Sequence, residues 1–135
     1  MNRPSSFPLT ALLLVAAGAL SLPTHAATPA ELLAGYTAQA GAPPAPARGQ
    51  QFFTSTHGRE WSCASCHGAL PTPPGKHAAT GKTIAALSPP FNPQRFTDPA
   101  KAEKWFRRNC NDVAGRECTA AEKADVLSWL LVLKP

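Results

Sequence analysis

The residues with the clearest chemistry lie in the segment Cys63-Ala-Ser-Cys66-His67, which holds two thiols and an imidazole within five positions. In a C-x-x-C-H motif the two thiols add across the vinyl groups of a haem, and the adjacent histidine lies under the iron. The spacing matters because two thioethers and one imidazole must reach three fixed points of a single macrocycle. The motif occurs once. We therefore expect one covalently attached haem c, with His67 as an axial iron ligand.

Two other uses of a C-x-x-C pair fit this sequence poorly. A thioredoxin-type redox pair belongs to a βαβ setting, and no such pattern surrounds the motif. A structural zinc site needs four ligands, and the remaining cysteines, Cys110 and Cys118, do not form a second C-x-x-C pair. Haem attachment is the interpretation that the motif favours.

The second axial ligand of the iron has to be a residue other than methionine. Methionine is the usual partner of histidine in small cytochromes c, but Met1 is the only methionine and lies in the N-terminal segment. Two histidines are candidates. His57 is only six residues before Cys63 and would have to loop to the opposite haem face, whereas His77 could reach it more easily. Either one could equally be an ordinary surface histidine.

A third candidate ligand, Asn109, comes from a helical stripe. Ala102, Trp105, Phe106 and Asn109 recur at i, i+3, i+4 and i+7, which puts them on one helix face. We expect Trp105 and Phe106 to contact the haem. A buried amide must find a partner, and iron would be one, although helix-terminal asparagines often satisfy backbone groups instead. Asn111 lies about 200° further round and should point away. This pattern leaves Asn109 and His77 both open.

The elements that position these residues are predicted to be helices. N-cap residues followed by proline or by a capping box predict helices that begin after Thr28, Asp98 and Thr119. Another helix is expected over about residues 47–56, with Phe52 and Phe53 facing inward. Residues 68–97 are rich in proline and glycine and lack periodicity, so we expect a long ordered loop that wraps the cofactor. The prediction is an all-α fold of three to four helices around one haem.

The first 26 residues have the pattern of a cleaved export signal. Arg3 precedes an uncharged apolar run over residues 9–20, and small residues end at Ala26. This run is too short to span a bilayer comfortably and is followed by Pro23, so we expect no stable membrane insertion. Cleavage after Ala26 would leave a single domain, residues 27–135, in the periplasm.

The charge balance favours an acidic or anionic partner. The formal net charge is +5, and removal of Arg3 with the signal leaves +4. No basic motif with interleaved aromatic residues indicates nucleic-acid binding.

Export also favours a disulfide between Cys110 and Cys118, which are eight residues apart. Closing such a loop stabilises a fold by roughly 2–3 kcal/mol. The bridge would pin the end of the Asn109 helix to the start of the last helix. Two free buried thiols or a redox-active bridge are the alternatives.

Together these segments resemble the sphaeroides haem protein (SHP) family of small, class I-like periplasmic cytochromes c. The resemblance is carried by residues 61–67, 80–82, 92–98, 104–113 and 115–119. It implies a class I-like cytochrome c fold, high-spin iron, a disulfide Cys110–Cys118 and an asparagine as sixth ligand. That asparagine would be Asn109, with Asn111 a lesser option.

The resemblance also implies a function. A neutral amide oxygen is a weak, hard donor that suits ferric iron better than ferrous iron. Reduction should therefore release Asn109, so that a small diatomic molecule such as O2 or NO can bind. The family receives electrons from a dihaem cytochrome c. A basic side of the Asn109 helix would suit such an acidic partner, or could be only a solvated face; its residues are Lys101, Lys104, Arg107 and Arg108.

Two rival functions are considered. The first is a bis-histidine electron carrier that uses His77 as the sixth ligand. The second is an enzyme that reduces O2, NO or peroxide, but it needs a distal acid–base residue, and His77 is the only evident candidate. Arg95, Lys82 and Trp61 are candidate partners for the haem propionates by charge, donor type and position.

Overall fold

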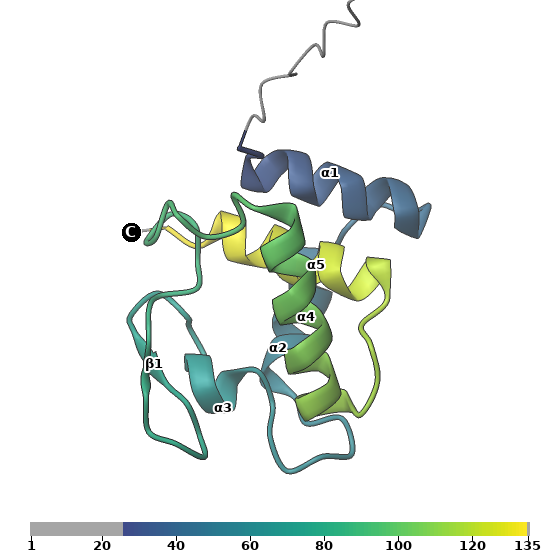
Figure 1. Ribbon diagram of the computed structural model, residues 1–135. Coiled ribbons are helices and arrows are strands. Elements are labelled where there is room, and N and C mark those ends of the chain that lie inside the picture. The colour runs from purple at the N-terminus through teal and green to yellow at the C-terminus, as the bar shows by residue number, and fades with distance from the viewer. Residues whose placement is uncertain (1–25, 135) are drawn as a thin grey trace, which may run out of the picture.

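The computed structural model describes residues 26–134, so the predicted signal segment lies outside the described residues apart from Ala26. The elements follow in the order α1 (Pro29–Ala40), α2 (Pro46–Thr54), α3 (Ala64–His67), β1 (Gly75–Lys76), β2 (Thr83–Ile84), α4 (Pro99–Ala114) and α5 (Ala120–Val132) (Figure 1). Four longer helices and one single-turn helix confirm the predicted all-α class. Within residues 26–134, every helix is too short or too polar to cross a membrane.

The predicted helix starts are confirmed. The Thr28 side chain accepts from the backbone N–H of Glu31, whose carboxylate accepts from the Thr28 N–H, and α1 begins there. Asp98 caps α4 through the N–H of Lys101 at 3.0 Å. Thr119 forms a second capping box at the start of α5. Each cap satisfies backbone N–H groups that the first turn of a helix leaves without partners.

Helix α2 differs from the prediction, because it begins at Pro46 and ends at Thr54 rather than spanning residues 47–56. Its start has no side-chain cap of its own and is bound to another helix. The carboxylate of Asp125, in α5, accepts from the Ala45 N–H at 2.6 Å and from Arg48 Nε at 2.8 Å. Asp125 is buried, and these donors offset the cost of removing its charge from water.

Helix α5 forms the centre of the fold and is buried continuously from residue 124 to residue 130. Its two sides contribute to two clusters. One side packs with α1 and α4, in a cluster formed by Leu32, Tyr36, Ala102, Ala124 and Leu127. The other side packs with α2, in a cluster formed by Phe53, Val126, Trp129 and Leu130. The α2–α5 contact requires Gly49, since a Cβ there would overlap the carbonyl oxygen of Asp125.

The segment between α3 and α4 is ordered as predicted, but it is not free of secondary structure. Strands β1 and β2 pair antiparallel, with Gly75 opposite Ile84 and Lys76 opposite Thr83. Two residues per strand are too few to produce a recognisable alternation in the sequence. Beyond this ribbon, the buried hydroxyl of Ser88 donates to the Leu130 carbonyl oxygen at 2.8 Å and fastens the loop to α5.

Candidate haem site

The C-x-x-C-H residues are brought together by the single turn of α3. The His67 N–H donates to the Cys63 carbonyl oxygen at 3.1 Å, which closes the turn. Positions i, i+3 and i+4 of a helical turn share one face, so Cys63, Cys66 and His67 point the same way. Neither cysteine is in a disulfide. The backbone N–H of Ala78, beyond β1, donates to Cys66 Sγ at 3.2 Å and holds this sulfur in place.

The surroundings of the motif keep His67 and Cys63 neutral. Burial, and then the positive charge of Arg95, lower the pKa of His67 to about 4. A neutral imidazole is the form that ligates a metal. Burial raises the pKa of the Cys63 thiol to about 11. The His67 ring also has an aromatic neighbour, since its centroid lies 6.1 Å from that of Phe53.

All three residues line a cavity of about 500 Å³. The predicted haem contacts lie around the same space, which is enclosed by α2, α3, the long loop, α4 and α5. Trp61, Lys82 and Arg95 line it, as do Trp105 and Phe106. Arg95 donates from Nε to the Ala86 carbonyl oxygen at 2.9 Å, and burial lowers its pKa. No carboxylate within residues 26–134 pairs with this guanidinium.

The α4 side of the cavity matches the predicted stripe in part. Ala102, Phe106 and Asn109 lie along it, and Trp105 does so while remaining 43% exposed. The four basic residues, predicted to form one basic side of the helix, divide between two surfaces. Lys101 and Arg108 border the cavity because they are only about 40° and 60° from Trp105 around the helix. The Arg108 guanidinium lies 5.7 Å from the Trp105 ring centroid, and only Lys104 and Arg107 face away from the cavity.

The structure distinguishes between the two asparagines that were candidate ligands. Asn109 is half-buried and lines the cavity, and its amide has no hydrogen-bond partner within residues 26–134. Asn111 is exposed, lies outside the cavity lining, and donates to the Arg107 carbonyl oxygen at 2.9 Å. Asn111 therefore behaves as the helix-terminal amide that satisfies local backbone.

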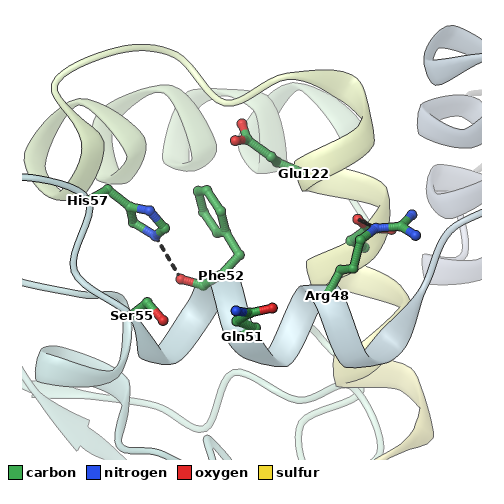
Figure 2. A pocket seen from close by; sticks show the side chains of 7 residues that line it. Arg48, Gln51, Phe52, Ser55, His57 and Glu122 are labelled. Carbon is green, nitrogen blue, oxygen red and sulfur yellow. Dashed lines mark hydrogen bonds and ion pairs between the residues drawn. The ribbon is translucent and has the colours of Figure 1, made fainter.

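The structure also distinguishes between the two histidines that were candidate ligands. His77 lines the cavity from the turn after β1, where its Nδ1 accepts from the Thr80 N–H at 3.3 Å. His57 lies in a different, surface pocket (Figure 2). Its Nε2 is 2.8 Å from the Phe52 carbonyl oxygen, and its ring stacks on Phe52 at 4.2 Å between centroids. His57 is not among the residues that line the haem cavity.

The predicted disulfide is present: Cys110 and Cys118 are bonded, with their Cα atoms 5.6 Å apart. Both cysteines are buried. The bridge joins the end of α4 to the residue before the α5 cap, so it restrains the backbone next to Asn109.

Several residues of the lining were not singled out from the sequence. Ile84, Leu87 and Phe96 come from the long loop, which has no periodicity that would mark an inward face. Phe96 has a φ of 60°, the left-handed conformation that costs a bulky residue most. Its ring lies 6.2 Å from that of Phe106, so packing against the cavity wall holds it there.

The residues fit a covalent haem: two unbonded thiols and a neutral imidazole on one turn, a largely apolar lining, and an amide that has no hydrogen-bond partner in the described part of the chain. Such a site in an all-α fold defines a small monohaem c-type cytochrome. The cytochrome c-type protein SHP of Cereibacter sphaeroides is 53% identical over 107 residues, which are 76% of this chain and 82% of the relative. The chain belongs to the SHP family of c-type cytochromes. A family model described as "Domain of unknown function (DUF1924)" also matches residues 39–130.

Further relatives agree with this assignment. Cytochrome c'' of Methylophilus methylotrophus is 44% identical over 79 residues, 58% of this chain and 55% of the relative. The structure of oxidised SHP, described as an oxygen binding cytochrome c, matches with a TM-score of 0.75 and 51% identity, covering 79% of this chain and 98% of that one. Oxidised cytochrome c'' matches with a TM-score of 0.69 and 36% identity, covering 79% and 95%. The predicted fold class and single covalent haem c are confirmed.

Proposed function

We propose that this chain is a periplasmic cytochrome in which Asn109 is a redox-labile sixth ligand of the haem iron. In this proposal it accepts electrons from a partner cytochrome and takes up a small diatomic molecule, O2 or NO, when reduced. A bound haem would supply redox-active iron, which His67 would ligate. The observation that carries the proposal is the Asn109 amide, which lines the same cavity as His67 and has no hydrogen-bond partner within the described chain.

The chemistry of the amide supports its release on reduction. A neutral amide oxygen is a weak, hard ligand, adequate for ferric iron and poor for ferrous iron. Asn109 would thus leave the axial position when the iron is reduced, within a cavity whose walls include Phe106 and Leu130. One relative is described as an oxygen binding cytochrome c. A solution structure of cytochrome c'' addresses haem-ligand detachment. Both support a labile ligand here.

The exposed part of the cavity supports contact with an acidic redox partner. Trp105 is partly exposed there, Lys101 and Arg108 line the cavity with it, and Lys104 is exposed on the adjoining surface of α4. We propose that an acidic partner, such as a dihaem cytochrome c, docks on this surface. The rate of reduction by that partner should fall steeply as salt is added. A rate independent of ionic strength would count against docking by charge.

Three further residues that line the cavity are proposed to bind the haem propionates. Arg95, whose half-buried guanidinium pairs with no carboxylate in residues 26–134, would hold a haem propionate, with Lys82 and Trp61 as further partners. Export to the periplasm is supported by the signal pattern of residues 1–26 and by the Cys110–Cys118 disulfide, which an oxidising compartment preserves.

Optical spectra of the haem-loaded protein test the proposal, recorded oxidised and then reduced under carbon monoxide. We expect a high-spin oxidised spectrum that Asn109→Ala perturbs, and rapid carbon monoxide binding on reduction. His77→Ala is the matched control, because His77 lines the same cavity, and it should leave the spectrum unchanged. A low-spin spectrum that changes in His77→Ala, ignores Asn109→Ala and resists carbon monoxide would instead indicate a bis-histidine electron carrier.

A further inference from the structure

The helix that carries Asn109 is tied to the core near its start by an ion pair. Lys123 Nζ, in α5, lies 2.7 Å from Glu103 Oε2, in α4. The Lys123 side chain is only 14% exposed, whereas that of Glu103 is 42% exposed. A lysine this deeply buried loses most of its hydration, so its partners have to compensate for that loss.

Two aromatic rings complete the surroundings of the Lys123 ammonium group. Nζ lies 5.5 Å from the centroid of Tyr36 and 6.0 Å from that of Phe106, within the range of cation–π attraction. The two rings meet edge to face at 5.8 Å. Tyr36 is 2% exposed, and burial raises the pKa of its hydroxyl far above the ordinary value. We call Lys123, Glu103, Tyr36 and Phe106 the α4 clamp.

The α4 clamp reaches the haem cavity through Phe106. This ring packs against both core clusters and lines the cavity three residues before Asn109. Lys123 itself sits next to the stretch of α5 that is buried from residue 124 to residue 130. The α4 clamp therefore fixes the position of α4 relative to α5, which has the longest buried stretch of the described helices.

Asn109 lies between two anchors. The α4 clamp holds α4 at Glu103 and Phe106, and the disulfide holds it at Cys110. Between these points the helix exposes Trp105, Arg107 and Arg108, and the ion pair that Arg107 makes with Glu117 at 3.9 Å is itself exposed, so the outer side is weakly held. How readily Asn109 moves must then depend on the α4 clamp and on the disulfide.

We infer that Lys123 is a positioning residue: through Glu103 and Phe106 it holds α4 so that Asn109 competes effectively against external ligands. This inference rests on the proposed function, since it assumes Asn109 as the sixth ligand. An external ligand of the oxidised protein has to displace Asn109. Its apparent affinity therefore rises in proportion to the fraction of molecules in which Asn109 is already released.

Cyanide binding to the oxidised, haem-loaded protein measures that competition. Lys123→Met should bind cyanide more tightly and faster, by roughly 2- to 30-fold. Glu103→Gln, at a more exposed position that tolerates substitution, should reproduce the effect. Lys134→Met removes the same charge from an exposed position and should match wild type. Carbon monoxide binding to the reduced protein should not change in Lys123→Met, because Asn109 is then already released.

Asn109→Ala separates failure of this inference from failure of the proposed function. Asn109→Ala should itself tighten cyanide binding, and adding Lys123→Met should give no further gain. If Asn109→Ala leaves cyanide binding unchanged, Asn109 is not the displaced ligand and the proposed function fails. If Asn109→Ala tightens binding but Lys123→Met and Glu103→Gln behave like wild type, the positioning role is overturned. A gain from Lys123→Met that persists in the Asn109→Ala background would also overturn it.

Discussion

Cys110, bonded to Cys118, directly follows Asn109 in α4, so the disulfide restrains the backbone beside the proposed iron ligand. The Asn109 amide lines the cavity without a hydrogen-bond partner in residues 26–134. A side chain that no hydrogen bond holds takes its position largely from its backbone. The bridge therefore links two features that the sequence presents separately, a second cysteine pair and a polar residue on an apolar helix face.

Removal of the disulfide should cost stability. The double variant Cys110→Ser/Cys118→Ser should lower the free energy of unfolding by roughly 2–3 kcal/mol, because the unfolded chain regains the freedom of the closed loop. Denaturant unfolding followed by tryptophan fluorescence measures it. Mild reductant applied to wild type should give the same loss, since it opens the disulfide and leaves thioethers intact. An unfolding midpoint that neither treatment moves would contradict a stabilising role.

The contact between α2 and α5 should not accept a methyl group at Gly49. A Cβ there would overlap the Asp125 carbonyl oxygen. We expect Gly49→Ala to destabilise the protein by about 1–3 kcal/mol, as overpacking does elsewhere. Gly35→Ala is the matched control. Nothing lies within 4 Å of a Cβ at Gly35, in α1. Helix propensity should make that change neutral or stabilising by up to about 1 kcal/mol. Equal stability of the two variants would refute the close approach of α2 to α5 at Gly49.

Acid should remove the contribution that the Glu122 carboxylate makes to the free energy of unfolding. Its carboxylate accepts from Arg116 at 2.6 and 2.8 Å, which holds the pKa of Glu122 below its ordinary value. The contribution is therefore present above the unfolded pKa, about 4.3, and is lost as pH falls through the folded value. The unfolding free energies of wild type and Glu122→Gln should differ by less than about 1 kcal/mol at neutral pH, because the Arg116 side chain is 50% exposed and water screens the pair.

The measurement is a denaturant series from pH 7 to pH 3, in which that difference should shrink toward zero. Glu117→Gln serves as the control, since its carboxylate lies 3.9 Å from Arg107 and 68% of its side chain is exposed. A difference for Glu122→Gln that stays constant across the series would show that its charge contributes nothing to stability.

The features that the sequence predicts well are local. Cys63, Cys66 and His67 define their site through spacing within one helical turn, and the caps at Thr28, Asp98 and Thr119 each involve residues three apart. Chemistry and geometry of this kind are complete within a short segment, so no knowledge of the fold is needed to interpret them.

The features that escaped prediction depend on packing between distant segments. Asp125 accepts from the Ala45 N–H across a separation of 80 residues, and Lys123 pairs with Glu103 across 20. Each of these charged residues looks like an ordinary surface position in its own helix. Phe96 adopts its left-handed conformation because its ring packs with Phe106, which the loop sequence does not reveal.

Crystal structures of the haem-loaded protein, determined oxidised and then chemically reduced, test the central claim most directly. In the oxidised crystal we predict electron density joining Asn109 Oδ1 to the iron opposite His67. In the reduced crystal we predict the amide turned away and that axial position open to carbon monoxide. Density that joins a His77 nitrogen to the iron in both states would contradict the account.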